Sequence, residues 1–336
     1  MTAAAPDAQR GFVLPAVLVV VGVVSLIFLV AITALDSLAD QTRRIVDEVR
    51  FRQAALSLEA EAAWFAATRP LAPAAIDLGE APGGLPAIIA LDGRAYASAS
   101  PSGLTVSLQD EAGLINLDAL DQNGMARLFT ELGAAPAMRG RMADRLADFL
   151  DPDDLKRLEG AEAPDYRHAG LPPPPDAPLR RTAQLFGLMG WGQQVDPAAW
   201  SRMRDVVTAD PTTAVVNANT APRPALRVLF GLTDAEAASA TARRGAAPFV
   251  SLEDFGRAAG VALVGDAERV YTFPSGRFAL KITDPAAGLV ARSRIVLTPA
   301  DPERPVWFDD RGIRALPADE KAERPTHAPP FPRPSA

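Results

Sequence analysis

The sequence predicts an α+β protein in which a long amino-terminal helix packs on a small antiparallel sheet, with a large all-helical domain inserted between strands. Three observations lead to this prediction. A helical pattern runs without interruption to Arg69, strand-like alternation occurs in two places far apart in the chain, and the stretch between those places has helical periodicity. Because paired strands must lie side by side, the helical stretch is expected to loop out of the sheet.

An apolar segment near the amino terminus is long enough to cross a lipid bilayer. No charged residue lies between Arg10 and Asp36, and about 20 apolar residues in a helix span the hydrocarbon core. The alternatives are a buried core helix and a secretory signal, but a signal has a shorter apolar stretch that ends in a small-residue cleavage site. A membrane-spanning helix is therefore expected, although the mixed charges that follow it give no orientation.

The same helix is expected to continue beyond the membrane. After Leu35, apolar residues recur at helical spacing among charged residues, which is typical of an amphipathic helix. Pro70 disfavours the helical conformation of the residue before it and cannot donate a backbone hydrogen bond. We therefore expect one helix over residues 12–69, with residues 12–35 in the membrane.

Two β-hairpins are predicted, one on each side of the helical stretch. Residues 94–100 and 104–108 flank a Ser-Pro-Ser-Gly turn, and residues 278–282 and 289–297 flank an Asp-Pro-Ala-Ala-Gly turn. Residues 71–86, which are rich in Ala, Pro and Gly, are expected to be an irregular connector. The two hairpins supply the strands of the predicted sheet.

Short polar signals organise the predicted insert. An Asn followed two residues later by Asp or Asn occurs twice, at Asn116 and at Asn217, each time before two helical segments. Residues whose side-chain oxygen can accept from the free amides of a first helical turn mark the expected helix starts. These capping residues are Asp118, Asn219 or Thr220, Thr233 and Ser251.

Composition and motifs exclude several classes of function. The chain has 34 Lys and Arg and 41 Asp and Glu residues, a net charge of −7, whereas a nucleic-acid surface needs clustered positive charge. There is no cysteine and there are only two histidines, which excludes thiolate chemistry and multi-histidine zinc sites. No phosphate-binding glycine loop, serine nucleophile elbow or zinc protease motif occurs, and nothing selects a catalytic pair of carboxylates. We expect a protein that is not an enzyme.

One segment resembles a helix-hairpin-helix unit, which in nucleic-acid-binding proteins holds a phosphate with backbone amides. Here Gly231 is followed by Thr233 where a second glycine would stand, and Asp234 and Glu236 come next. Two carboxylates at this point would repel a phosphate, so a hairpin used as scaffold is the favoured interpretation. The alternative function is a membrane-anchored helix-hairpin-helix nucleic-acid-binding protein of competence type.

An acidic cluster lies at residues 148–154, where the sequence is Asp-Phe-Leu-Asp-Pro-Asp-Asp, and Glu159 and Glu162 follow closely. Carboxylates in a short proline-containing turn suit a hard cation such as calcium, which takes about six to eight oxygen ligands. The spacing is not that of an EF-hand. The other interpretation is a solvated acidic turn in which Asp151 or Asp153 caps a helix.

The amino terminus resembles the leader of type IV pilins and type II secretion pseudopilins, because Gln9-Arg10-Gly11 is followed by Phe12 and then by the apolar helix. In that family a prepilin peptidase cuts after the glycine and methylates the new amino terminus, which here implies a cut between Gly11 and Phe12. Most members have a glutamate at the fifth mature position, where this chain has Ala16. A carboxylate in hydrocarbon is costly unless it pairs with a neighbouring subunit, so its absence suits a subunit with no neighbour above it.

Four motifs follow one another in the soluble part. They are Asp110-Glu111-Ala112-Gly113-Leu114-Ile115-Asn116-Leu117, residues 148–154, Gly160-Ala161-Glu162 with Tyr166, and Val215-Val216-Asn217-Ala218-Asn219-Thr220-Ala221-Pro222. In this order the motifs resemble those of the type II secretion minor pseudopilin K family, over about residues 11–299. The resemblance implies a pilin-type helix and sheet interrupted by a large helical domain. It also implies a subunit that forms a tip complex with minor pseudopilins I and J and helps to initiate and cap the pseudopilus.

Members of that family bind calcium, so the resemblance favours calcium as the ligand of the acidic cluster. It further implies an inner-membrane anchor, a soluble domain in the periplasm, contacts with other pseudopilins, access to exported substrate and no nucleic-acid partner. The metal ligands that follow are Asp151, Asp153, Asp154, Glu159 and Glu162.

Beyond Asp309 the chain is rich in proline and charge, and we expect it to be disordered. The expected organisation is a cleaved leader (1–11), the amino-terminal helix (12–69), the first part of the sheet (70–119), the helical insert (120–266), the second part of the sheet (267–308) and a disordered tail (309–336).

Overall fold

The computed structural model describes residues 13–80, 86–261, 270–317, 320 and 328–333. The chain forms two compact units, Met1–Gln53 and Ala54–Ala336. The expected leader and its cleavage point at Gly11 and Phe12 lie outside the described residues.

The amino-terminal helix α1 extends over Val13–Thr68, as predicted, and ends where Pro70 prevents its continuation. Its apolar part is long and apolar enough to cross a membrane, with a mean hydropathy of 3.0 over its most apolar window. In the second unit the helix buries residues three and four positions apart, which form one face. These residues are Ala55, Leu58, Ala62, Phe65 and Ala66.

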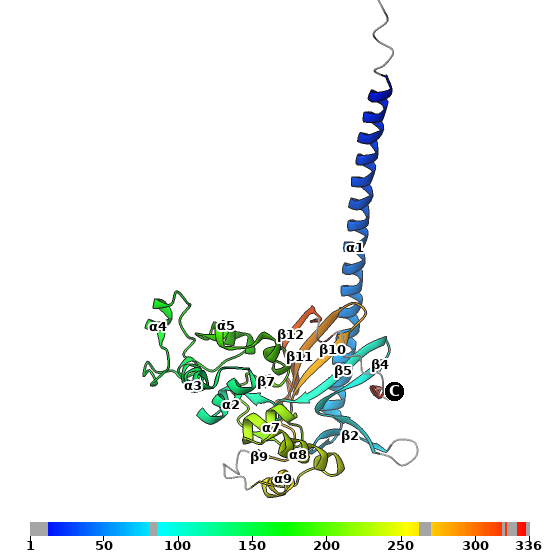
Figure 1. Cartoon of the computed structure of the whole chain (residues 1–336). Coiled ribbons are helices and arrows are strands. Elements are labelled where there is room, and N and C mark those ends of the chain that lie inside the picture. The colour runs from blue at the N-terminus through cyan, green and yellow to red at the C-terminus, as the bar shows by residue number, and fades with distance from the viewer. Residues whose placement is uncertain (1–12, 81–85, 262–269, 318–319, 321–327, 334–336) are drawn as a thin grey trace, which may run out of the picture. The chain divides into compact units, whose positions relative to one another are not determined.

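A five-stranded antiparallel sheet carries both predicted hairpins (Figure 1). The strand order is β12-β11-β10-β5-β4, so β5 and β10, which flank the insert in sequence, are direct neighbours. The insert therefore leaves and re-enters the sheet between adjacent strands. The strands are β4 (Asp92–Ala99), β5 (Ser102–Asp110), β10 (Arg277–Asp284), β11 (Leu289–Leu297) and β12 (Val306–Ala315).

Alternation along the strands gives the sheet two different faces. Leu108 pairs with Leu280, and Val106 pairs with Ile282, and all four side chains are buried. The alternate residues of β5 are polar and line the opposite face, which borders the insert. They are Thr105, Ser107 and Gln109. One face thus builds the core and the other borders a cavity.

The expected irregular connector after α1 instead forms a second, three-stranded sheet. It contains β1 (Leu71–Ala72), β2 (Ala75–Glu80) and β3 (Pro86–Ala90) in the order β1-β2-β3. The prediction was wrong because Ile76, within this Pro- and Gly-rich segment, pairs with Ile89 just beyond it, and both side chains are fully buried.

The expectation of disorder from Asp309 is wrong for the part up to Ala315. This part belongs to β12, which pairs with β11 along its length and forms the edge of the sheet. Further on, Phe331 is buried between the rings of Phe65 and Tyr96, with ring centroids 6.2 and 6.1 Å away. Long-range pairing and one buried ring therefore order residues whose composition alone suggests disorder.

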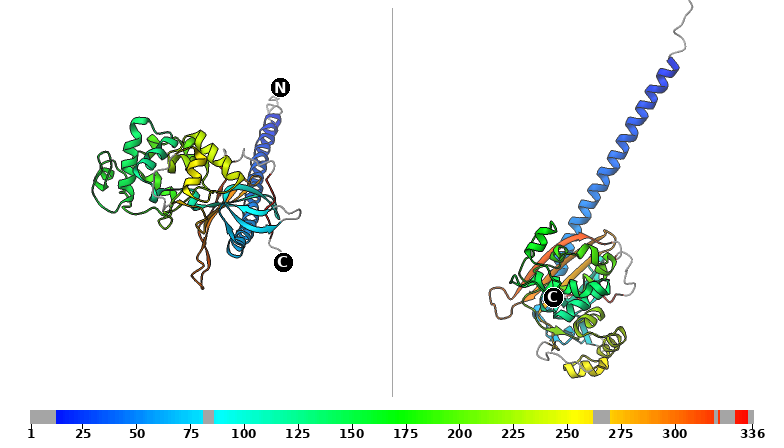
Figure 2. Two further views of the ribbon diagram at one scale, coloured as in Figure 1. Left: turned by 90° about the horizontal axis from the view of Figure 1, so that it is seen from below. Right: turned by 60° about the vertical axis from the view of Figure 1, so that its left-hand side comes forward.

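The insert is helical, as predicted, and its helices gather to one side of the five-stranded sheet in the left view of Figure 2. Short strands that the sequence does not signal tie it together: β6 (Ile115–Asn116) pairs with β7 (Val207–Thr208), and β8 (Val216–Asn217) pairs with β9 (Val270–Tyr271). The helices are α2 (Gln122–Glu131), α3 (Pro136–Leu150), α4 (Ala163–His168), α5 (Trp191–Gln194), α6 (Pro197–Met203), α7 (Arg223–Phe230), α8 (Asp234–Ala246) and α9 (Leu252–Ala259), with the 3-10 turns η1 (Glu111–Gly113), η2 (Leu117–Ala119) and η3 (Thr182–Gly187).

Two of the predicted capping residues are confirmed. Thr233 caps α8 in a reciprocal capping box, and Ser251 caps α9. Asp118 does not cap α2, because its carboxylate accepts from the backbone N–H of Leu179 (2.8 Å), and Asp121 caps that helix instead. The side-chain oxygen of Asp118 that was predicted to cap a helix thus forms a tertiary hydrogen bond instead.

Candidate functional site

The buried carboxylate of Asp110, in the first sequence motif, joins the sheet to the insert. Its Oδ2 accepts from Asn217 Nδ2 and Thr220 Oγ1, each at 3.0 Å. Its Oδ1 accepts from the backbone N–H and the hydroxyl of Ser275, at 3.0 and 2.7 Å. Burial raises the pKa of Asp110, and these hydrogen bonds act in the opposite direction. Residues from the insert and from the segment that follows it thus converge on the carboxylate at the end of β5.

The repeated Asn signal corresponds to a repeated turn. Asn116 accepts from the N–H of Asp118 (3.3 Å), and Asn217 accepts from the N–H of Asn219 (3.0 Å). The Asn116 amide also donates to the carbonyl of Asp210 (2.7 Å). Each copy of the signal therefore anchors a two-residue strand at the base of the insert.

Asn219 and Thr220 do not cap a helix, contrary to prediction, because α7 begins after Pro222. The Asn219 amide instead donates to the carbonyls of Phe249 (3.0 Å) and Thr272 (3.2 Å) and accepts from the N–H of Phe249 (2.7 Å). These bonds fix the loop before α9 and the loop before β10. The second Asn motif is thus a set of long-range connections.

A buried ion pair lies beside Asp110. Glu111 binds Arg294 of β11 through Nε at 2.7 Å, and Asp210 binds Arg277 of β10 at 2.6 Å. Burial raises the pKa of Glu111, while Arg294 lowers it. Since removing one member would leave a buried charge unpaired, these pairs hold the insert against the sheet.

Gly113 stands where no side chain fits. A Cβ atom on this residue would lie 2.6 Å from Thr220 Oγ1 and 2.8 Å from Gln109 Nε2. Gln109 itself donates to the carbonyl of Thr220 (3.0 Å). Glycine therefore permits the close approach of the two motif segments.

The acidic cluster begins at the end of α3 with a carboxylate that sequence reasoning did not place among the metal ligands. Asp148 is fully buried and accepts from the backbone N–H of Arg157 (3.2 Å), whose guanidinium also lies 3.2 Å away. Gly160 packs against it, and a Cβ there would lie 1.8 Å from Asp148 Oδ2. Asp148 therefore shapes the loop that carries the other acids.

The five predicted metal ligands fall into two groups. Asp153 accepts from the N–H of Leu155, and Glu159 pairs with Arg141, both at 2.8 Å. Asp151, Asp154 and Glu162 lie close enough to interact electrostatically, although Asp151 also contacts Arg157 (3.2 Å). In the second group, negative charges surround the buried carboxylate of Glu162. They belong to Asp151 and Asp154, and also to Asp148 and Asp176.

Glu162 is 4% exposed, and within the described part of the chain neither of its carboxylate oxygens has a hydrogen-bond partner. Burial, followed by the negative charges of the surrounding aspartates, raises the pKa of Glu162 to about 7. Asp151 and Asp176 each have one buried oxygen without a hydrogen-bond partner as well. Asp176 was missed because it follows a run of prolines, and only the fold brings it to Glu162.

These orphaned oxygens are suited to calcium, which prefers carboxylate ligands. Within the described part of the chain, however, no three such side chains already stand at metal-binding positions. Binding an ion there would require the loop between α3 and α4 to draw its carboxylates together.

The surface of α1 is a second candidate site. From Leu14 to Leu35 its large apolar side chains are exposed, for example Leu26 at 61% and Phe28 at 65%. Ala16, the position where the resemblance implies a missing glutamate, lies within this helix. The first unit therefore presents an apolar surface without a carboxylate at that position.

The hairpin of α7 and α8 gives no support to phosphate binding. Asp234 and Glu236 lie in the first turn of α8, and the nearby Arg227 pairs with Asp234 (2.9 Å) and Glu131. Its positive charge is thus already matched by carboxylates. The hairpin instead packs into the core of the insert, where the ring of Phe230 contacts that of Phe255.

Comparison with known proteins places these motifs in a family. Family models described as type II secretion system (T2SS), protein K match residues 105–212 and 216–272, together about half the chain. Type II secretion system protein K of Pseudomonas aeruginosa is 30% identical over an alignment of 169 residues, and the match covers 45% of this chain and 47% of that relative. The chain thus aligns with about half the length of this curated relative.

A solved structure has the same fold. A chain of the crystal structure of the GspK-GspI-GspJ complex from the enterotoxigenic Escherichia coli type 2 secretion system matches with a TM-score of 0.57 at 18% identity. The match covers 83% of this chain and 99% of that chain. It confirms the predicted α+β fold.

Replacing Gly113 by Ala should destabilise the protein by at least ~2 kcal/mol, because the new methyl group forces Thr220 and Gln109 apart. Thermal unfolding of the full chain in detergent measures the effect. Gly140→Ala in α3 is the matched control, since a Cβ there meets nothing within 4 Å and Ala favours the helix. Equal midpoints for the two variants would contradict the role of Gly113.

Replacing Glu162 by Gln should stabilise the protein in chelator, and more so at pH 8 than at pH 5. The folded pKa of Glu162 is raised to about 7 from 4.5, so the stability that its protonated form contributes is lost as the pH rises through about 7. The variant has no charge to lose, and the gain should approach ~3 kcal/mol at pH 8. Glu159→Gln, at a half-exposed acid paired with Arg141, is the matched control. A gain for Glu162→Gln that is independent of pH would be inconsistent with the raised pKa.

Proposed function

The chain belongs to the family of protein K of the type II secretion system, and from this membership we propose that it is a minor pseudopilin at the tip of the pseudopilus. In this role it helps to initiate and cap pseudopilus assembly for protein export across the outer membrane. The observation that carries the proposal is α1, a 56-residue helix with an apolar, exposed first part and Ala at position 16. The chain acts as an assembly protein and not as an enzyme.

The helix supports assembly in two ways. Burying its apolar side chains against neighbouring helices contributes about 25 cal/mol per Å² before the cost of ordering is subtracted. Ala16 leaves no carboxylate to pair with the terminal amine of a subunit placed above. The same helix can therefore join a bundle from below without recruiting a further subunit.

The proposed processing, location and partners follow from this role. Cleavage between Gly11 and Phe12, with methylation of Phe12, would release the leader, and the apolar part of α1 would anchor the chain in the inner membrane with the second unit in the periplasm. Minor pseudopilins I and J are the proposed partners, since the structural relative was crystallised as a GspK-GspI-GspJ complex. The tip position would also bring the chain within reach of exported substrate.

The competence-type alternative is not favoured by any observation. The net charge is −7, and the hairpin that would hold a phosphate carries Asp234 and Glu236 at its critical turn. Such a protein would need a positive surface to compensate phosphate charge.

We also propose that the acidic cluster binds calcium. The candidate ligands from the sequence remain, and the structure adds Asp148 and Asp176 as neighbours of Glu162. A bound ion would neutralise the repulsion among these carboxylates and would supply partners for the orphaned oxygens of Glu162, Asp151 and Asp176. The support is this unbalanced buried charge, which a divalent cation relieves.

Replacing Leu26 by Lys should abolish secretion, because a charge near the middle of the membrane segment costs about 2.5–3.5 kcal/mol and disrupts packing against other helices. The measurement is the fraction of an exported protein found outside cells that carry the variant in place of this chain. Leu158→Lys is the control, since Leu158 is 96% exposed in a loop of the second unit. Normal secretion with Leu26→Lys, at normal levels of the variant, would argue against the proposed role.

Adding 1 mM calcium in place of chelator at pH 7.5 should raise the unfolding midpoint of the wild-type chain in detergent by several degrees. A ligand present at 100 times its dissociation constant stabilises the folded state by about 2.7 kcal/mol. Glu162→Gln should lose most of this gain, whereas a variant of the exposed acid Glu253 should keep it. An unchanged midpoint for the wild type would count against a calcium site.

A further inference from the structure

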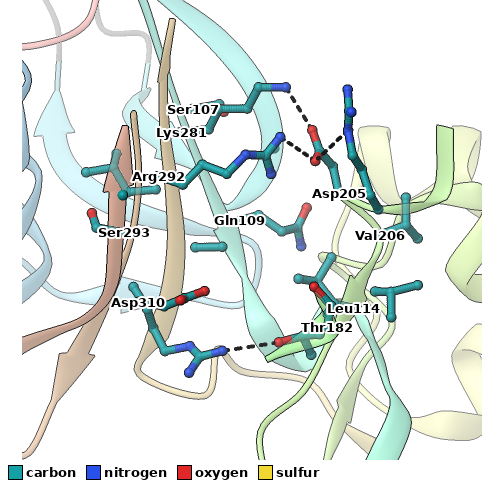
Figure 3. A pocket seen from close by; sticks show the side chains of 18 of the residues that line it. Ser107, Gln109, Leu114, Thr182, Asp205, Val206, Lys281, Arg292, Ser293 and Asp310 are labelled. Atoms are coloured by element: carbon teal, nitrogen blue, oxygen red, sulfur yellow. Dashed lines mark hydrogen bonds and ion pairs between the residues drawn. The ribbon is translucent and has the colours of Figure 1, made fainter. Parts of the chain in front are cut away.

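A cavity of about 760 Å³ lies between the polar face of the five-stranded sheet and the part of the insert that contains η3, α6 and β7. This volume is in the range of ligand-binding sites. Figure 3 shows side chains from both walls turned toward one another, with Lys281 and Arg292 of the sheet directed at Asp205 of the insert. The cavity therefore has a charged centre formed by two parts of the second unit.

Four cations gather at this centre. Arg204 follows α6, whereas Lys281, Arg292 and Arg314 belong to three neighbouring strands, β10, β11 and β12. Asp205 binds Lys281 at 2.8 Å and Arg292 at 2.5 Å. Burial alone would raise the pKa of Asp205, but Arg292 and Lys281 hold it below its ordinary value.

A second carboxylate, from the carboxyl-terminal part of the chain, occupies the same cluster. Glu320 contacts Lys281 at 2.5 Å and Arg292 at 3.7 Å, and it forms a close ion pair with Arg204. Its side chain is only 13% exposed. Glu320 is distant in sequence from these three cations. The chain itself thus places a carboxylate from a distant segment in the cavity.

The two acids leave the cluster with more positive than negative charge. Arg314 makes no ion pair with any described residue, and burial, with the charges of Arg292 and Arg204, lowers its pKa. Guanidinium groups match the geometry of carboxylates and bind them through paired hydrogen bonds. A partly desolvated cluster of this kind binds anions more strongly than isolated surface cations do.

We propose that this cavity binds an acidic segment of a second polypeptide through its side-chain carboxylates, and that Glu320 is an internal ligand which such a segment displaces. Glu320 demonstrates that a carboxylate on a peptide chain fits the cluster, and Arg314 supplies charge for one more. Phe186 and Trp200, which pack edge to face on the cavity wall, offer apolar contact for the same segment. The proposal concerns a binding site of the isolated chain, so it stands or falls independently of the tip role.

The test measures binding of a blocked tetraglutamate peptide to the full chain in nonionic detergent at low salt, with blocked tetraglutamine as the reference peptide. Glu320→Gln should tighten tetraglutamate binding at least ~5-fold, because it frees cations that the wild type already uses. In the Glu320→Gln background, Arg292→Gln should weaken binding at least ~10-fold, and Arg314→Gln should weaken it ~3-fold. Arg304→Gln is the control, since Arg304 is exposed and does not line the cavity.

Each other outcome would overturn the proposal. Equal binding by the wild type and Glu320→Gln would show that Glu320 does not compete for the site. Equal losses with Arg292→Gln and Arg304→Gln would reduce the interaction to general charge attraction. Arg314→Gln breaks no ion pair with a described residue, so a loss of binding in this variant is not explained by misfolding. Displacement of tetraglutamate by inorganic phosphate at equal charge concentration would assign the cavity to phosphate-bearing ligands instead of peptides.

Discussion

The fold of the second unit depends on the burial of the Asp110 carboxylate. A buried carboxylate is costly unless hydrogen bonds replace its hydration. Here the replacing donors come from Asn217, Thr220 and Ser275, which are more than a hundred residues away along the chain. They assemble only when the sheet and insert have both folded, so this polar centre makes the two parts cooperative.

This constraint explains where the insert can be placed. Adjacent strands β5 and β10 would normally be joined by a short turn, and here the Asp110 centre closes the gap between them in place of that turn. The ion pair of Glu111 and Arg294 adds a second connection from the base of the insert to β11. The sheet thus stays continuous while it carries a helical domain, and the matched family segments lie on this joint and on the insert itself.

Features set by neighbouring residues could be predicted from the sequence, and features set by distant residues could not. The end of α1 at Pro70 and the caps at Thr233 and Ser251 follow from local rules. In contrast, β12 is ordered by pairing with β11, and Asp176 joins the acidic cluster only because the fold returns the proline-rich loop to it. Contacts between residues that are distant in sequence cannot be predicted from the composition of either segment.

Asp110 and Glu162 are two buried carboxylates in opposite surroundings. Both carboxylates are buried, and burial raises both pKa values. Donors surround Asp110, whereas other acids surround Glu162, which has no donor among the residues that the structure describes. Hydrogen bonds offset part of the desolvation of Asp110 and tie its carboxylate to three distant residues. At Glu162 the desolvation and the repulsion remain uncompensated, and their relief is available to a cation that binds there. The surroundings of these two carboxylates therefore differ, although both are almost fully buried: donors surround the one and acids the other.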